Sequence, residues 1–186
     1  MDGFRTSGET KMKEQGYFHR VSRMTPTRLW INNVTPEEAE AAIAIGATGC
    51  TQNPTYPEKM LTHPEGKARA YGLLDEILRE EPDDNEALSK LQCALVKLVA
   101  EKFLPLHRAS RGRLGYVTIQ ADPFHEDADN ILRAARAHCA ASPNIMAKIP
   151  AIPAGFEAMR VLLREGCPVL ATEVMSVAQA LDCARI

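Results

Sequence analysis

The chain has 186 residues, of which 45% are hydrophobic and 25% charged, an ordinary balance for a globular protein with a substantial core. Its formal net charge of -2, with basic residues scattered and no aromatic side chains between them, argues against binding to nucleic acid or to an anionic membrane surface. The five cysteines show no CxxC spacing and lie in apolar segments, so we expect reduced core thiols in a cytoplasmic protein.

Residues 1–26 are polar and mixed in charge, with no apolar stretch long enough for a signal peptide or a membrane span. We expect them to form a flexible N-terminal leader. Residues 27–186 show no repeat, low-complexity segment or internal boundary, and predict a single domain.

Short apolar runs alternate with helical patterns along this domain. Strands are predicted at residues 29–31, 47–51, 115–120, 145–149 and 168–174. Helices are predicted at residues 37–45, 127–141, 154–164 and 176–184, with two longer helical stretches between the second and third strands. This alternation implies parallel strands joined by right-handed crossovers. It fits either an open doubly wound sheet or an incomplete (β/α)₈ barrel.

Two helices have clear local signals. Thr35 is a candidate N-cap, with Pro36 at the first helical position and acids in the first turn. The longest helical stretch carries an apolar stripe at the i, i+3, i+4, i+7 spacing. Its members are Leu88, Leu91, Ala94, Leu95, Leu98 and Val99. One face of this helix is therefore expected to be buried.

Polar residues follow or end several of the predicted strands. They are Asn32, Thr51, Asn53, Gln120, Lys148 and Thr172. The carboxyl ends of parallel strands are where α/β folds gather their active sites. We therefore expect these side chains to converge, although Gln120 and Thr172 can also satisfy backbone groups, and Thr51 and Asn53 can simply close a turn.

Lys148 lies within a short apolar run, between Ala147 and Ile149. Desolvation lowers the pKa of an amine and leaves more of it as the free nucleophile, which can form a Schiff base with a ketone. Taken alone, a strand lysine whose stem packs while its ammonium reaches water is the more common case.

The chain resembles the transaldolase family of class I aldolases from about Leu29 to its end. The matching segments are the turn 49–54 (GCTQNP), residues 117–122 (VTIQAD), Lys148-Ile149-Pro150, residues 155–158 (GFEA), Glu165-Gly166, and Thr172 followed by Ser176, Gln179 and Ala180. The resemblance implies a (β/α)₈ TIM barrel of the transaldolase type, with about five of its eight units in this chain.

The resemblance also implies roles for the residues at the strand ends. Lys148 would form the imine with a ketose phosphate such as fructose 6-phosphate, and a dihydroxyacetone unit would be transferred or released. Gln120 and Thr172 would orient a water molecule near the imine, and Thr51 and Asn53 would hold substrate hydroxyls. No cofactor and no metal is implied. The acids near His125 are better explained as the start of a helix than as metal ligands.

Two positions distinguish branches of the family. Gln120 and the run Leu170-Ala171-Thr172 are similar to fructose-6-phosphate aldolases, whereas transaldolases carry glutamate and asparagine there. Both activities stay open on this basis. The aspartate that ends the first strand in the family corresponds here to Asn32, with Asn33 beside it. An amide cannot act as a general base near neutral pH, so proton transfer is expected to be weakened or relocated.

A complete barrel needs eight strands, and this chain predicts five. The family's phosphate-binding arginine and the aldolase tyrosine have no counterpart in it. We expect a truncated or partial enzyme; the alternatives are a barrel completed by a homo-oligomer or by a complementing C-terminal half, and a non-catalytic relative that binds a sugar or a partner.

Overall fold

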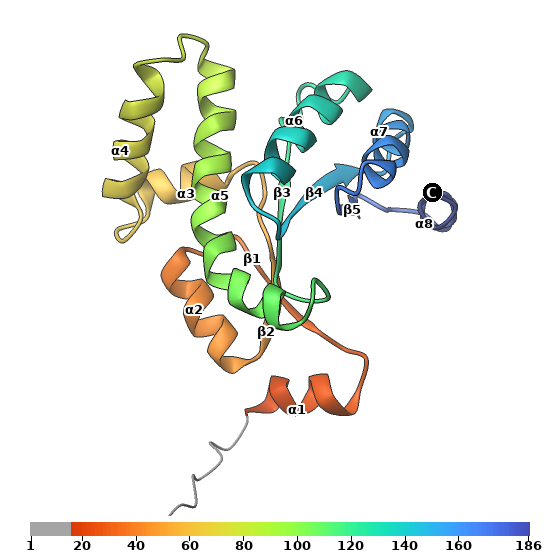
Figure 1. Cartoon of the computed structure of the whole chain (residues 1–186). Coiled ribbons are helices and arrows are strands. Elements are labelled where there is room, and N and C mark those ends of the chain that lie inside the picture. Colours follow the sequence, from red (N-terminus) through yellow and green to blue (C-terminus); the bar gives the residue numbers. More distant parts are fainter. Residues whose placement is uncertain (1–15) are drawn as a thin grey trace, which may run out of the picture.

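Five parallel strands form a curled sheet in a computed structural model that describes residues 16–186 (Figure 1). The strands are β1 (Leu29–Asn32), β2 (Ala47–Thr51), β3 (Tyr116–Gln120), β4 (Ile145–Pro150) and β5 (Val169–Thr172). Each strand pairs with the next one along the chain, in the order β1-β2-β3-β4-β5. A doubly wound sheet would reverse its strand order at a switch point. The prediction of a partial (β/α)₈ barrel is confirmed, and the doubly wound alternative is wrong.

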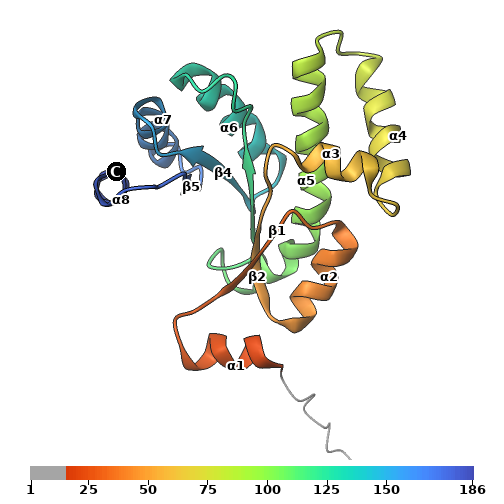
Figure 2. The ribbon, with the colours of Figure 1, turned by 180° about the vertical axis from the view of Figure 1, so that it is seen from behind.

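Eight helices surround this sheet among the described residues, most of them on its outer side (Figures 1 and 2). They are α1 (Tyr17–Met24), α2 (Pro36–Ile45), α3 (Tyr56–Thr62), α4 (Lys67–Leu78), α5 (Asp84–Ala109), α6 (Ala128–Ala141), α7 (Pro153–Arg164) and α8 (Val177–Ala184). Of these, α2, α5, α6 and α7 contact strands directly, while α3 and α4 pack against α5. The two buried apolar clusters lie between these helices and the sheet.

Helix α1 lies within the segment expected to be a flexible leader. It packs near the end of α2, where a ring nitrogen of His19 lies 3.1 Å from the carbonyl oxygen of Ala44. Residues 1–15 of the expected leader lie outside the described residues.

The start of α2 agrees with its sequence signal. The Thr35 hydroxyl accepts a hydrogen bond from the backbone N–H of Glu38, and the Glu38 carboxylate accepts one from the backbone N–H of Thr35. This capping box satisfies two N–H groups that the helix itself leaves unpaired. Thr35 is fully buried, so the cap also fixes how the chain leaves β1.

The apolar stripe of α5 is only partly as expected. Leu91, Leu95 and Val99 are completely buried against the sheet. Leu88 is 50% exposed, because the first turns of α5 extend beyond the strands (Figure 1). On the buried face one turn later lies Gln92, a polar residue that is 6% exposed and whose amide is hydrogen-bonded.

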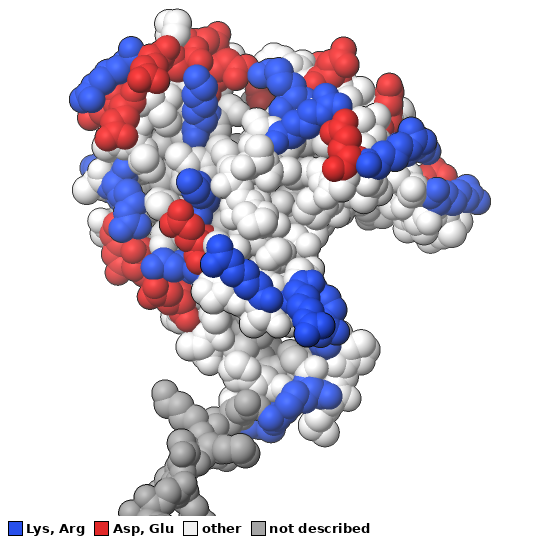
Figure 3. Space-filling model, viewed as in Figure 1, with Lys and Arg blue, Asp and Glu red and all other residues white. Residues whose placement is uncertain are grey.

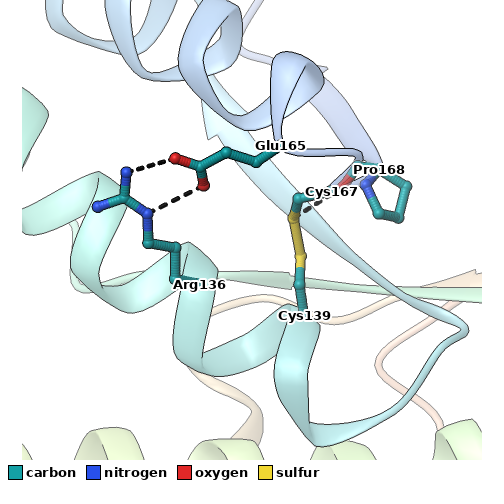
Figure 4. The surroundings of a disulfide bond; sticks show 5 residues. All are labelled: Arg136, Cys139, Glu165, Cys167 and Pro168. Carbon is teal, nitrogen blue, oxygen red and sulfur yellow. Dashed lines mark hydrogen bonds and ion pairs between the residues drawn. A yellow bond between two sulfur atoms is a disulfide. The ribbon is translucent and has the colours of Figure 1, made fainter.

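A disulfide joins Cys139 of α6 to Cys167, which precedes β5 (Figure 4). Their Cα atoms lie 6.2 Å apart, and Arg136 and Glu165 form a two-pronged ion pair beside them at 2.6 and 3.0 Å. The expectation that all five cysteines are reduced is therefore wrong. Sequence spacing gave no signal because the pair is brought together by the packing of α6 on α7. The disulfide also removes the cysteine argument for a cytoplasmic location, since disulfides are uncommon there.

The surface carries charges of both signs. On the face shown in Figure 3, basic and acidic side chains are interspersed along the outer helices. Within residues 16–186, no helix combines the length and the apolar character needed to cross a membrane.

His138 makes stability depend on pH. It lies on the inner side of α6, 2% exposed, and burial lowers the pKa of its imidazole from 6.5 to about 4. Between about pH 4 and pH 6.5 the imidazole is therefore protonated in the unfolded chain but not in the folded chain. This contribution to stability is complete above pH 6.5 and is lost as the pH falls towards 4.

We expect acidification from pH 7.5 to 4 to cost the wild type about 3 kcal/mol more unfolding free energy than it costs His138→Gln. Urea unfolding at several pH values measures the difference. Parallel pH dependences of the two proteins would show that His138 does not titrate in this way.

Candidate functional site

The predicted site residues lie at the carboxyl ends of the strands. The sheet register sets Asn32 beside Thr51 and Gln120 beside Lys148. Thr172 stands opposite Pro150, two residues beyond Lys148 on β4. Hydrogen bonds join Asn32, Thr51, Asn53 and Lys148 into one network. The structure thus joins four of the six expected positions and places Gln120 and Thr172 at neighbouring strand ends, while the roles attached to all six stay predictions.

Lys148 lies at one end of this network. Its Nζ donates a hydrogen bond to Oδ1 of Asn53 at 2.5 Å. The side chain is half-buried, and its neighbours Ala147 and Ile149 are almost completely buried on the opposite face of β4. Burial lowers the pKa of the Lys148 ammonium, and the negative charge of Glu173 acts in the opposite direction. The net lowering increases the fraction of free amine near neutral pH.

Asn53 serves both the turn and the site. Its backbone carbonyl accepts a hydrogen bond from the N–H of Tyr56 at 2.9 Å, and its own N–H donates to Oδ1 of Asn33 at 2.8 Å. Its side chain faces the other way, accepting from Lys148 and donating from Nδ2 to Oδ1 of Asn32 at 3.3 Å. Asn53 therefore closes the turn, as expected, and its side chain is also in contact with Lys148; its role in holding a substrate stays a prediction.

Asn32 and Asn33 are distinguished by their contacts. Asn32 Oδ1 accepts from the Thr51 hydroxyl at 2.8 Å as well as from Asn53. Asn33 has a left-handed backbone with φ 48°, and its side chain supports the backbone of the turn. Of the two, Asn32 is the one whose side chain is linked to Lys148, by way of Asn53. Its amide offers a hydrogen-bond acceptor but no titratable proton.

Gln120 connects the site to a carboxylate that the sequence analysis missed. Its side chain is 6% exposed, and Nε2 donates to Oε1 of Glu173 at 3.1 Å. Glu173 directly follows β5 and has a left-handed backbone with φ 61°. A non-glycine residue in this region is uncommon and is often found at functional sites.

Gln92 is a second residue near the site that was not predicted from the sequence. From the buried face of α5, its Nε2 donates to the backbone carbonyls of Gln120 at 3.2 Å and Asn53 at 3.4 Å. One amide thereby fixes the ends of two strands from the outer layer. Its position about one turn before the buried Leu95 was a usable signal, because a polar residue on an apolar helix face needs a partner.

Two threonines, Thr172 and Thr118, belong to the same face of the sheet as Lys148. The carbonyl of Thr172 accepts from the N–H of Ala151 at 2.8 Å, which ties the end of β5 to the residue after β4. Thr118, two residues before Gln120 on β3, is fully buried, and its hydroxyl has no hydrogen-bond partner among the described residues. The alternation of Thr118 with Gln120 could have identified it as facing the same side of the strand.

The acids near His125 belong to a helix start, as expected. Asp127 is the N-cap of α6 and accepts from the backbone N–H of Asn130 at 3.0 Å. His125 pairs with Asp122 at 2.7 Å on the exposed loop before it. Within residues 16–186, no group of three or more histidine, cysteine or acidic side chains has the arrangement of a metal site.

Comparison with known proteins gives one consistent result. The sequence profile of a family described as transaldolase/fructose-6-phosphate aldolase matches residues 29–186. The chain is 26% identical over 162 residues to a transaldolase of Neisseria gonorrhoeae, covering 83% of this chain and 45% of that protein. It is 30% identical over 158 residues to one of Acidothermus cellulolyticus, covering 80% of this chain and 42% of that protein. The chain thus spans less than half the length of these relatives.

Proposed function

Because the chain belongs to the transaldolase/fructose-6-phosphate aldolase family, we propose that it performs Schiff-base aldol chemistry with Lys148 as the nucleophile. The substrate class is a ketose phosphate such as fructose 6-phosphate, and the product is a dihydroxyacetone unit that is transferred or released. The observation that carries this proposal is the half-buried Lys148 amine with a lowered pKa, 2.5 Å from an amide oxygen at the carboxyl end of a barrel strand.

The chemistry follows from the groups around the amine. Attack of Lys148 on the ketone and loss of water produce an iminium, which withdraws electrons from the adjacent carbon–carbon bond. When that bond breaks, an aldehyde leaves and an enamine stays on Lys148. Asn53 and Thr51 supply donors and acceptors for substrate hydroxyls, and Gln120 and Thr172 orient water near the imine.

A second function is favoured by one observation. Asn32 places an amide where removal of a hydroxyl proton would need a base. The chain would then bind a sugar phosphate without efficient turnover. In either case a homo-oligomer or a complementing C-terminal half is proposed to supply further barrel strands, and the cytoplasm, where sugar phosphates are metabolised, is the proposed compartment.

Borohydride reduction tests the first function. Folded protein incubated with fructose 6-phosphate or dihydroxyacetone and then reduced is expected to gain the mass of one reduced dihydroxyacetone unit. Repeated turnover to glyceraldehyde 3-phosphate without an acceptor would indicate an aldolase, and turnover only with erythrose 4-phosphate a transaldolase. An adduct without any release would favour the binding function, and folded protein with no adduct would contradict imine chemistry.

A further inference from the structure

The residues that line Lys148 leave proton transfer unassigned. Imine formation needs a group that takes a proton from the ammonium and later gives one to the departing hydroxyl. Asn32, Asn53 and Gln120 are amides and cannot do so near neutral pH, and a threonine hydroxyl such as that of Thr51 is no better.

Glu173 is the carboxylate that reaches this region. Its Oε1 accepts from Gln120, which is the register partner of Lys148 on the neighbouring strand. Its charge acts on the Lys148 ammonium, yet among the ion pairs of residues 16–186 none joins the two side chains. The carboxylate is thus placed one hydrogen bond from the strand neighbour of Lys148 and is not engaged in an ion pair with the amine.

The backbone holds Glu173 in this position. Its left-handed φ of 61° turns the chain directly after Thr172, so that the side chain meets Gln120 on β3. Gln179 of α8 donates from Nε2 to the carbonyl of Ala151 at 2.9 Å and to that of Glu173 at 3.4 Å. An unfavourable backbone conformation persists only where the surroundings enforce it, and here Gln120 and Gln179 enforce it from both sides.

We propose that Glu173 is a catalytic acid–base residue for imine formation at Lys148, an assignment that rests on the proposed Schiff-base function. The carboxylate accepts a proton from the ammonium and leaves the amine free. The amine nitrogen then forms a bond to the ketone carbon, and a proton passes from nitrogen to the former carbonyl oxygen. Glu173 returns its proton to this hydroxyl, the carbon–oxygen bond breaks and water leaves. The nitrogen lone pair forms the iminium, and the carboxylate is regenerated.

Glu126 provides a matched control. It lies in the loop before α6, and burial together with the nearby charge of Glu173 raises the pKa of its carboxyl, so the two acids are near each other. No hydrogen bond of the described residues joins Glu126 to Gln120, whose side-chain bond goes to Glu173. Glu173→Gln and Glu126→Gln therefore remove the same charge from the same neighbourhood, but only one removes the proposed acid–base group.

The test is the rate at which dihydroxyacetone is trapped on the full chain in the presence of cyanoborohydride, followed by intact mass. We expect Glu173→Gln to slow trapping by about 10²-fold, the lower end of what a positioned acid–base group contributes. The final extent of labelling and the urea unfolding curve should match the wild type, Glu173→Asp should recover part of the rate, and Glu126→Gln should react like the wild type.

The outcomes separate the two proposals. Equal trapping rates in the wild type and Glu173→Gln would overturn the role of Glu173 and leave the Schiff-base function standing. Equal slowing in both Gln variants would also overturn it, because the effect would then be one of charge alone. No adduct on folded wild-type protein would overturn both proposals together.

Discussion

Lys148→Met will abolish the borohydride-trapped adduct and any sugar-phosphate cleavage by the chain. Methionine keeps most of the apolar stem and its packing, but it removes the amine that forms the covalent bond. The loss should therefore be complete, whereas the free energy of unfolding should change little, because the ammonium is half-buried and desolvated in the folded state. Intact mass after reduction and urea unfolding measure the two effects.

Lys59→Met is the control for this substitution. Lys59 is also near the site, but its Nζ is bound by the carbonyl of Asn33 at 2.6 Å and by the carboxylate of Glu38 at 2.8 Å. An ammonium held by an ion pair is a poor nucleophile, so this variant should form the adduct as the wild type does. If the adduct formed in Lys148→Met but not in Lys59→Met, the nucleophile would be Lys59, and the assignment to Lys148 would be wrong.

Asn32→Asp will raise the rate of carbon–carbon bond cleavage by about 10²-fold, the lower end of the range for a positioned general base. A carboxylate oxygen can accept the same hydrogen bonds from the Thr51 hydroxyl and from Asn53 Nδ2, so the network keeps its geometry. The new group differs from the amide in being able to take the substrate's hydroxyl proton. Single-turnover release of glyceraldehyde 3-phosphate from fructose 6-phosphate measures the rate.

The adjacent asparagine provides the comparison. Asn33→Asp introduces the same charge one residue away, where the side chain accepts from the backbone N–H of Asn53 and supports the turn. No gain in rate is expected there, since this carboxylate would point away from Lys148. If both aspartates accelerated cleavage equally, or neither did, the position of Asn32 in the site would not be what limits the reaction.

Much of the fold was predictable because its local signals agree with its tertiary structure. Residues 47–51 form a strand with the predicted bounds, and Thr35 caps the helix that Pro36 begins. Polar residues that end apolar runs converge in a parallel sheet, since all strands point the same way. The site around Lys148 could be located from sequence for this reason.

What could not be predicted depends on geometry that the sequence does not encode locally. Residue 173 was expected inside a strand over residues 168–174, but β5 ends at Thr172 and a left-handed turn brings Glu173 onto Gln120. Cys139 and Cys167 are 28 residues apart and meet only because α6 and α7 are neighbours. Leu88 fits the helical stripe, yet it is half exposed, because the first turns of α5 extend beyond the sheet (Figure 1).

The most direct measurement is the position of the covalent adduct. Folded protein treated with dihydroxyacetone and borohydride is digested, and its peptides are sequenced by mass spectrometry. We expect the reduced three-carbon unit on the peptide that contains Lys148 and on no other lysine, because its amine has a lowered pKa and contacts the amide of Asn53 at the ends of the strands. A peptide 145–150 that stays unmodified in folded protein, or labelling spread evenly over surface lysines, would contradict Schiff-base chemistry at this site.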